Sequence, residues 1–207
     1  MSAPFVTVPA AGLDTARAYK LMIGCVVPRP IAWITSMGAG GRVNAAPFSS
    51  YNYFCHSPPM LGVNIGLRDG KLKDTARNIL ETREFTVNVV TEAVQPQMHA
   101  CSADFPPEVS EPEALGIALL PGVHVKPPRV AASPIHMECR LDQAIRLGTG
   151  QNTLYIGEVV AFHLSRDVFD GESVDSGKLR PLARLGGPYY TTLGKIIFAP
   201  IVAAPPR

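Results

Sequence analysis

Residues 136–164 contain two long segments of strand-like sequence on either side of a short turn signal. The segments are 136–147 and 153–164, and the residues between them include Gly148 and Gly150. Two long strands joined by so short a connection favour antiparallel pairing. The rest of the chain adds many short strands and few helices, so the sequence predicts one antiparallel barrel or sandwich with helices packed outside it.

The remaining predicted elements are short and separated by turn residues. Residues 1–12 form an extended lead-in, and Asp14 can cap a helix over 15–22 by accepting from its first N–H groups. Further helices are predicted over 74–82 and 92–103, and further strands over 31–36, 43–46, 60–65, 84–90 and 195–202. The acidic, proline-rich residues 104–113 are predicted to form a surface loop, with a lid over a site as the alternative. No linker divides the chain, which is predicted to be a single domain over 1–207.

The glycine and proline content indicates a folded chain rich in turns. The 18 glycines and 20 prolines exceed average usage, yet they stay below the content of low-complexity disorder. The 19 basic and 17 acidic residues are scattered, and lysine and arginine form no run. Because a nucleic-acid binder usually carries a basic patch or stripe, we expect no nucleic-acid partner.

The cysteines do not follow the spacing of a metal site or of a disulfide framework. Cys25, Cys55, Cys101 and Cys139 form no CxxC pair, so we expect reduced thiols and no bound metal. The apolar stretch 21–34 is interrupted by two prolines and is shorter than the roughly 20 apolar residues of a membrane-spanning helix. No targeting segment is recognised at the N-terminus. We therefore expect a cytoplasmic protein without a membrane span.

Three segments place polar residues where a ligand can bind, although the sequence has no P-loop and no dinucleotide-binding glycine motif. In the first, small polar side chains cluster where two predicted strands end, and Pro47 exposes backbone groups beside them. Such a place can hydrogen-bond a flat polar ring. Ordinary strand-end turn chemistry is the alternative, and spacing alone favours it. The clustered residues are Thr35, Ser36, Ser49, Ser50 and Asn52.

The second segment is the start of the helix predicted over 74–82. The N-terminus of a helix offers free N–H groups and the positive end of the helix dipole, which together bind phosphate readily. Lys73 adds a positive charge there and Thr75 a hydroxyl, whereas Asp74 opposes a dianion unless it faces away. A capped surface helix is an equally good interpretation of these residues alone.

The third segment is 182–190, which contains Gly186 and Gly187. The two glycines allow another backbone to approach closely, and Arg184 with the neighbouring tyrosines can lie against an aromatic ligand. A connecting loop whose tyrosines pack on the core is the alternative, and it is favoured for this segment alone.

Taken together, these segments resemble the flavin reductase-like, FMN-binding split-barrel family. The resemblance is strongest to the branch that contains the flavin reductase component of nitrilotriacetate monooxygenase, and it covers roughly residues 18–200. The motifs occur in the family order and with similar spacing. They are RPIAWITS (29–36), NAAPFSSY (44–51), SPP (57–59), KDTARN (73–78), EFTVN (84–88) and RLGGPYY (184–190).

The resemblance implies a mainly β fold, a six-stranded antiparallel Greek-key split barrel with peripheral helices. It also implies a homodimer with FMN near the dimer interface, FAD being less favoured. The residues near the isoalloxazine ring and ribityl chain would come from 33–52, those at the phosphate from 73–78, and those closing the site from 184–190. By motif, the implied FMN-binding residues are Trp33, Thr35, Ser36, Ala46, Pro47, Phe48, Ser49, Asn52, Lys73, Thr75, Asn78, Arg184 and Tyr190.

The activity implied by the resemblance is that of an NAD(P)H:flavin reductase. Hydride would pass from NAD(P)H to N5 of FMN, and reduced FMN would go to a partner monooxygenase. Hydride transfer needs no general acid or base, so no catalytic residue is assigned. Short-chain members carry Gly-Asp-His where this chain has Gly150-Gln151-Asn152, a segment associated with the nicotinamide side. A flavoredoxin-like electron carrier and a non-catalytic flavin- or haem-binding module are the alternatives.

Overall fold

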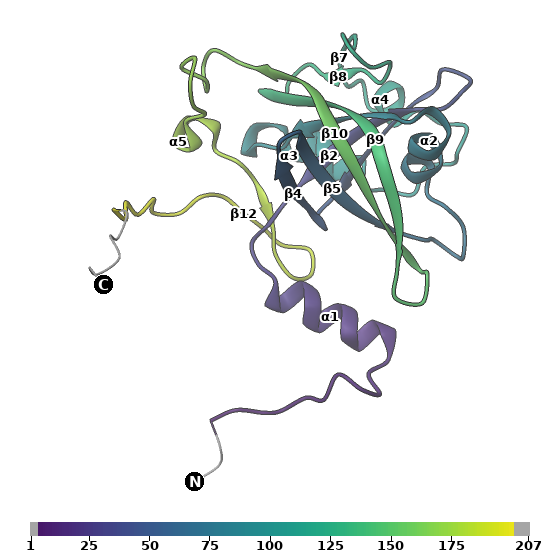
Figure 1. Cartoon of the computed structure of the whole chain (residues 1–207), viewed down its shortest axis with the longest axis vertical. Helices are drawn as coiled ribbons and strands as arrows, with labels where there is room; N and C mark the ends of the chain where they lie inside the picture. Colours follow the sequence, from purple (N-terminus) through teal and green to yellow (C-terminus); the bar gives the residue numbers. More distant parts are fainter. Residues whose placement is uncertain (1–3, 201–207) are drawn as a thin grey trace.

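A seven-stranded antiparallel sheet forms the body of the protein in the computed structural model, which describes residues 4–200 (Figure 1). The strand order is β3-β2-β6-β9-β10-β5-β4. Short turns and β-rich sequence account for most of these neighbours. In chain order the strands are β2 (Ala32–Met37), β3 (Val43–Phe48), β4 (Tyr51–His56), β5 (Pro59–Gly66), β6 (Glu84–Val89), β9 (Ile135–Leu147) and β10 (Asn152–Leu164).

The two edge strands of this sheet are consecutive in the chain, so the sheet curls back on itself. Only Ser49 and Ser50 separate β3 from β4, and the N–H of Asn64 on β5 donates to the carbonyl of Ser50 at 2.8 Å. Taken as one bent strand, β3 and β4 leave six strands around a barrel. The predicted fold, a mainly β, six-stranded antiparallel barrel, is confirmed, and so is the predicted long pair β9–β10.

The other elements lie around this barrel. A small sheet contains β1 (Arg29–Pro30), β11 (Ala183–Arg184) and β12 (Tyr190–Thr191), and a second pairs β7 (Leu119–Leu120) with β8 (Arg129–Val130). None of the helices within residues 4–200 combines the length and apolar character needed to cross a membrane. The helical segments are α1 (Thr15–Cys25), α2 (Asp74–Thr82), the 3-10 turn η1 (Glu92–Val94), α3 (Gln95–Ala100), α4 (Glu111–Ala114) and α5 (Ser176–Leu179).

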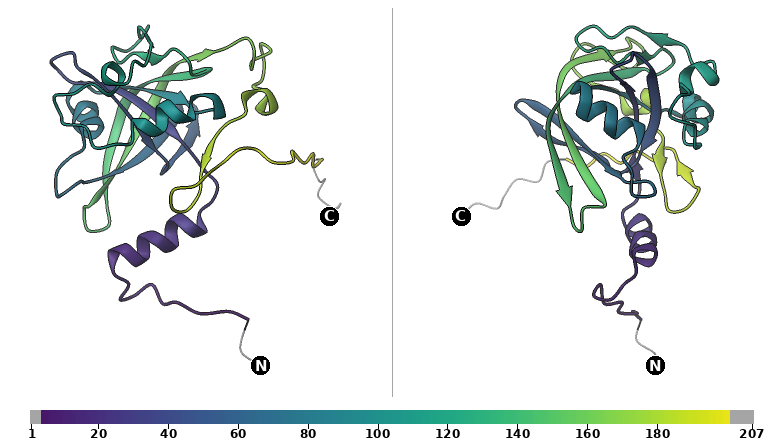
Figure 2. Two further views of the ribbon diagram at one scale, coloured as in Figure 1. Left: turned by 180° about the vertical axis from the view of Figure 1, so that it is seen from behind. Right: turned by 90° about the vertical axis from the view of Figure 1, so that its right-hand side faces the viewer.

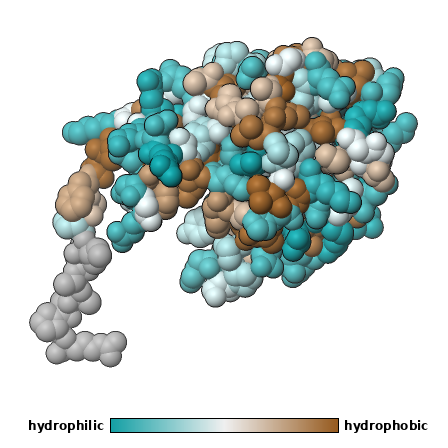
Figure 3. All heavy atoms as spheres, turned by 90° about the horizontal axis from the view of Figure 1, so that it is seen from above, coloured by the Kyte–Doolittle hydropathy of each residue, from teal (hydrophilic) through white to brown (hydrophobic). Residues whose placement is uncertain are grey.

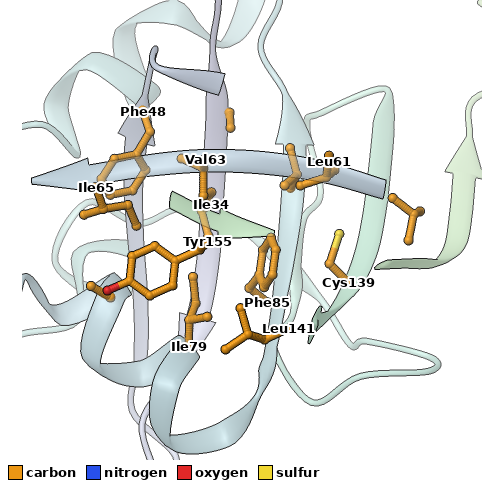
Figure 4. Packing of buried hydrophobic residues seen from close by; sticks show 14 residues of the cluster. Ile34, Phe48, Leu61, Val63, Ile65, Ile79, Phe85, Cys139, Leu141 and Tyr155 are labelled. Atoms are coloured by element: carbon orange, nitrogen blue, oxygen red, sulfur yellow. The ribbon is translucent and has the colours of Figure 1, made fainter. Parts of the chain in front are cut away.

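Apolar side chains fill the barrel, and helix α2 contributes two of them. Ala76 and Ile79 of α2 are buried in the same cluster as Phe85 and Tyr155 from the barrel wall (Figure 4). Because these residues lie three apart on α2, they share one face of the helix. The barrel core therefore fixes the helix, and with it the position of the helix N-terminus.

A second apolar cluster lies on the outer face of β2. Trp33 is fully buried there with Ile31 and Met98, whereas Ala32 and Ile34 point into the barrel. Successive strand residues alternate between faces, so a strand covered on both sides is apolar throughout. This explains why 31–36 contains no charged residue, and it places α3 against the outside of β2.

One carboxylate is fully buried on β9. Glu138 accepts hydrogen bonds from the N–H groups of Val123, His124 and Val125 at 2.5 to 3.2 Å, and Nε2 of His163 lies 2.9 Å from it. Burial alone would raise the pKa of Glu138, but these backbone donors and His163 together hold it below its usual value. The carboxylate thereby fastens the 121–130 loop to the barrel.

The helix predicted over 92–103 is wrong in its extent. The chain makes the 3-10 turn η1 first, and then a separate helix, α3, with Pro96 in its first turn. Proline has no N–H to extend a preceding helix, so the helix begins anew at this point. Residues 101–103 leave the helix as turns.

The strand predicted over 195–202 is wrong for the residues that the structure describes. Residues 192–200 have no regular secondary structure, and 201 and 202 lie outside the described residues. A strand needs a neighbour for its backbone groups, and 195–200 has none within 4–200. The predicted loop 104–113 ends earlier, at Ser110, which is the N-cap residue of α4 (Glu111–Ala114). The strand predicted over 43–46 continues to Phe48, because β3 is an edge strand and tolerates proline.

Candidate functional site

A groove with a volume of about 920 Å³ runs between β3, the N-terminus of α2 and the segment 101–107. Ala46, Pro47 and Phe48 form one wall, and Lys73 with Thr75 forms another. Its volume falls in the range of ligand-binding clefts. The groove therefore joins two of the three polar segments that the sequence marked as places where a ligand can bind.

The end of the groove at α2 carries cationic residues interspersed with acidic ones. Lys73 is the N-cap residue of α2, and no side chain caps the first N–H groups of that helix. Arg68, Lys71 and Arg77 line the groove beside it. Burial, with the charge of Arg68 as a second cause, lowers the pKa of Lys73. A partly desolvated ammonium group at a helix N-terminus is a good binding position for a phosphate.

Asp74, the acidic residue that the sequence placed at this helix start, is paired with a neighbouring cation. Asp74 is the first residue of α2, and its carboxylate pairs with the guanidinium of Arg77 one turn later. The negative charge of Asp74 is thereby neutralised locally. Lys73 remains available to a ligand, with its Nζ 5.9 Å from the centre of the Phe48 ring.

A buried polar network supports the N-terminus of α2 from below. Nδ2 of Asn44 donates to Oγ1 of Thr75 at 2.8 Å, and Nδ2 of Asn78 donates to Oγ of Ser36 at 3.2 Å. All four residues are buried. Since fully satisfied polar networks hold their members in fixed positions, this network sets the height of α2 above β2 and β3.

A second, smaller compartment of about 230 Å³ adjoins the groove and shares Pro47, Phe48 and Ser102 with it. Arg184 lies over the ring of Tyr190, with its Cζ 4.7 Å from the ring centre. Nδ1 of His99 lies 2.8 Å from Oη of Tyr190. This compartment contains the third polar segment of the sequence, together with a histidine of α3.

The third segment reaches this position by a close backbone approach. A Cβ atom added to Gly186 would lie 3.5 Å from the backbone of Ile23 and Gly24, at the end of α1. Gly187 has φ +65°, a conformation that favours glycine. The turn between β11 and β12 is therefore able to pack beside α1, as Figure 2 shows.

The structure brings eight of the implied FMN-binding residues together along the groove and its smaller compartment. They come from four separate parts of the chain, which the barrel and the small sheet assemble. Ser49 lines only the smaller compartment, and Pro47 and Phe48 line both. The eight residues are Ala46, Pro47, Phe48, Ser49, Lys73, Thr75, Arg184 and Tyr190.

The other five implied residues line neither compartment. Trp33 packs in the outer apolar cluster, and Thr35 donates to the carbonyl of Pro128, both fully buried behind β3. Ser36 and Asn78 belong to the network beneath α2. Asn52 is exposed on β4, where its Oδ1 accepts from the next N–H. These side chains support or flank the site and do not form its surface.

The sequence assigned no site role to the residues that complete the walls, apart from a lid formed by 104–113 as the alternative to a surface loop. Asp104 to Pro107 line the groove, and Asp104 pairs with Arg68 across its rim at 2.7 Å. Glu111 lines the same groove and accepts from the N–H of Ala45 at 3.0 Å, and burial raises its pKa. Only the acidic, proline-rich composition of 104–113 marked this segment. His99 had no distinguishing signal apart from its neighbour Cys101.

The thiol in the groove has no features of a nucleophile. Cys101 is buried beside the outer apolar cluster, and burial raises its pKa to about 12. A thiol with such a pKa stays protonated near neutral pH and is unreactive. Within residues 4–200, no group of histidine, cysteine or acidic residues has an arrangement that could hold a metal ion.

The donors of this site fit a flavin mononucleotide. A terminal phosphate needs cations and free N–H groups, which Lys73 and the N-terminus of α2 provide. A flat aromatic ring needs an apolar surface with a few polar groups at its edge. Pro47 and Phe48 provide that surface next to Ser49 and Arg184.

Comparisons with known proteins agree with this geometry. Residues 23–190 match the family model described as the flavin reductase like domain. The uncharacterized protein YwrF of Bacillus subtilis is 37% identical over 189 residues, which cover 88% of this chain and 92% of YwrF.

Two solved structures are similar over nearly the whole chain. Nitrilotriacetate monooxygenase component B from Bacillus cereus superimposes with a TM-score of 0.92 at 31% identity, covering 96% of this chain and 100% of that one. The 2-nitrobenzoate 2-nitroreductase NbaA of Pseudomonas fluorescens gives a TM-score of 0.88 at 34% identity, with 98% and 99% coverage. The family match spans most of the chain, and it includes every segment that lines the groove. The chain therefore belongs to the flavin reductase-like family.

Proposed function

We propose that this protein is an FMN-binding NAD(P)H:flavin oxidoreductase. The observation that carries the proposal is the continuous groove, which leads from a cationic helix N-terminus at Lys73, past Phe48, to Arg184. A ligand with a phosphate at one end and a flat ring at the other matches that order of groups. Membership of the flavin reductase-like family supports the same assignment.

Bound FMN would supply the redox chemistry, accepting a hydride equivalent from NAD(P)H at N5. The protein's own residues would bind the FMN and orient it. Lys73 and the first N–H groups of α2 hold the phosphate, while Pro47 and Phe48 support the ring. The guanidinium of Arg184 stabilises negative charge at the ring end of the groove. The wall formed by 104–107 limits the access of water to the end of the groove at α2.

The biological setting follows from the same proposal. A cytoplasmic reductase of this kind would supply reduced FMN to a flavin-dependent monooxygenase, since component B of nitrilotriacetate monooxygenase is similar over nearly its whole length. FMN is preferred to FAD, because the cationic end of the groove offers one helix N-terminus for one phosphate.

We also propose that the protein is a homodimer. Helix α1 has no buried residue and stands away from the barrel (Figure 1). The C-terminal segment carries Ile196, Ile197 and Phe198, each at least 65% exposed, and Figure 3 shows hydrophobic residues on that segment outside the main body. Exposed apolar surface of this extent is typical of an interface.

Light scattering after size exclusion should give twice the chain mass of 22.2 kDa, and a monomer at micromolar concentration would contradict the proposed homodimer.

The experiment for the activity is a visible spectrum of the purified protein with added FMN, followed by anaerobic NADH and then NADPH. We expect flavin absorption that bleaches within seconds with one of the two donors. Protein that binds no FMN would contradict both the site and the function. Without protein, the same mixture should bleach far more slowly.

A flavoredoxin-like electron carrier is the second candidate, and one observation favours it. Gly150, Gln151 and Asn152 lie at the turn between β9 and β10 and line neither compartment. This is the segment associated with the nicotinamide side in short-chain members. Bound flavin that stays oxidised with both nicotinamide donors, but is reduced by a low-potential protein donor, would support the carrier.

A further inference from the structure

The smaller compartment carries positive charge without a counter-charge. Arg29 and Arg184 both line it, together with His99. Within residues 4–200, no aspartate or glutamate lines this compartment, and neither arginine takes part in an ion pair. Such a cavity attracts an anion.

The missing counter-charge matters most for Arg29, because this residue is only 8% exposed. Its guanidinium donates to the carbonyls of Ile23 and Val26 at 2.7 Å, and to that of Leu185 at 2.9 Å. These carbonyls satisfy its hydrogen bonds but carry no net charge. Buried charges are usually paired, so the charge of Arg29 lacks the partner that such a position normally has.

The small sheet brings the second arginine directly opposite the first. Arg29 on β1 and Arg184 on β11 are register partners in an antiparallel pair. Like charges directly opposite each other destabilise a pair of strands. One N–H of Arg184 donates to the carbonyl of Gly187 at 2.8 Å. An anion bound between the two guanidinium groups would remove the repulsion.

The rest of the compartment selects the shape of that anion. Tyr19 and Ile23 of α1, Ile31 and the ring of Phe48 provide apolar walls, and Tyr190 offers a hydroxyl. The volume of about 230 Å³ suits one aromatic ring with small substituents and is a quarter of the adjoining groove. An inorganic anion would leave the apolar walls without a partner.

We propose that this compartment is a binding site for a small aromatic carboxylate beside the ring end of the flavin groove, with which it shares Pro47 and Phe48. Its carboxylate lies toward Arg184 and Arg29, and its ring lies against the walls from α1 and Phe48. The site does not depend on flavin reduction. Its occupant would lie beside the ring end of the groove, across Pro47 and Phe48, in a position to control access to a bound flavin.

Isothermal titration with benzoate tests the site, with benzamide as the neutral compound of the same shape. We expect benzoate to bind at least tenfold more tightly than benzamide, and Arg184→Gln to weaken benzoate about tenfold or more. Arg166→Gln is the matched control, since Arg166 is exposed and lines neither compartment. It should leave the affinity for benzoate unchanged.

The titration is run on FMN-free and on FMN-loaded protein, and binding is expected in both. Benzoate that binds no better than benzamide, or equally well to the Arg184→Gln variant, would overturn the proposal. Loss of benzoate binding on FMN loading would also overturn it, because the compartment would then belong to the flavin. Failure of FMN itself to bind is read in a separate titration and contradicts only the proposed function.

Discussion

Replacing Glu138 by alanine is expected to lower the free energy of unfolding by about 3–5 kcal/mol. Three backbone N–H groups of residues 123–125 donate to this carboxylate, which is fully buried. Removing the acceptor leaves these donors and His163 without a partner inside the protein. The 121–130 loop would lose its attachment, and with it the hydrogen bonds from Thr35 and Thr86 to Pro128 and Pro127.

Urea unfolding of the variant at pH 7.5 measures this loss, with Glu158→Ala as the matched control. Glu158 is exposed on the neighbouring strand β10, so its replacement should cost less than about 0.5 kcal/mol. The lowered pKa of Glu138 adds a second readout. Its stabilisation is complete above the unfolded-state pKa and is lost as the pH falls toward the folded-state pKa. The difference between wild type and Glu138→Ala should therefore narrow below about pH 4.5. A difference below 1 kcal/mol at pH 7.5 would contradict the role of Glu138.

The parts of the fold that could be predicted from sequence are those set by local patterns. The pair β9–β10 is long and joined by a glycine turn, and α2 has apolar residues on one face, so both were found with nearly correct ends. The break in the helix at Pro96 depends on backbone geometry, and the absence of a strand after residue 195 depends on whether a partner strand lies beside it. Residues 195–200 have strand-like composition but no partner strand. Composition alone contains no information about a partner.

The candidate site divides in the same way. Lys73 and Thr75 sit at a helix start, a position that the sequence marks directly. Thr35 and Ser36 were placed at the ring by motif, yet the alternation of β2 turns them toward buried partners. His99 could not be predicted. It reaches Tyr190 only because β11 pairs with β1 from the other end of the chain.

The groove and its smaller compartment differ in how their charges are balanced, and this difference suits them to different ligands. Near α2, the cations Lys73 and Arg68 have acidic neighbours in Asp74 and Asp104. In a site with both charges, a ligand phosphate can replace a protein carboxylate as the partner of a cation. In the smaller compartment the arginines have no acidic neighbour within the described residues. The end of the groove at α2 therefore favours a ligand that binds reversibly. Lys73 is the residue at this end whose loss should distinguish a ligand with a phosphate from one without it.

Replacing Lys73 by alanine is accordingly expected to weaken FMN binding about 10- to 100-fold, which corresponds to roughly 1.4–2.8 kcal/mol. The affinity for riboflavin, which lacks the phosphate, should change less than about threefold, because Phe48 and the rest of the ring site remain. Quenching of flavin fluorescence measures both affinities. Lys126→Ala is the control, since Lys126 is exposed and lines neither compartment.

The comparison between the two flavins makes this test specific to the phosphate. A variant that merely disturbed α2 would weaken FMN and riboflavin alike, because Thr75 and the network beneath it hold the helix against β3. Added salt should weaken FMN binding to the wild type more than to the variant, since the screened charge is absent in the latter. Equal losses for the two flavins would place the phosphate elsewhere, and Arg184 in the smaller compartment would then be the cation to replace next.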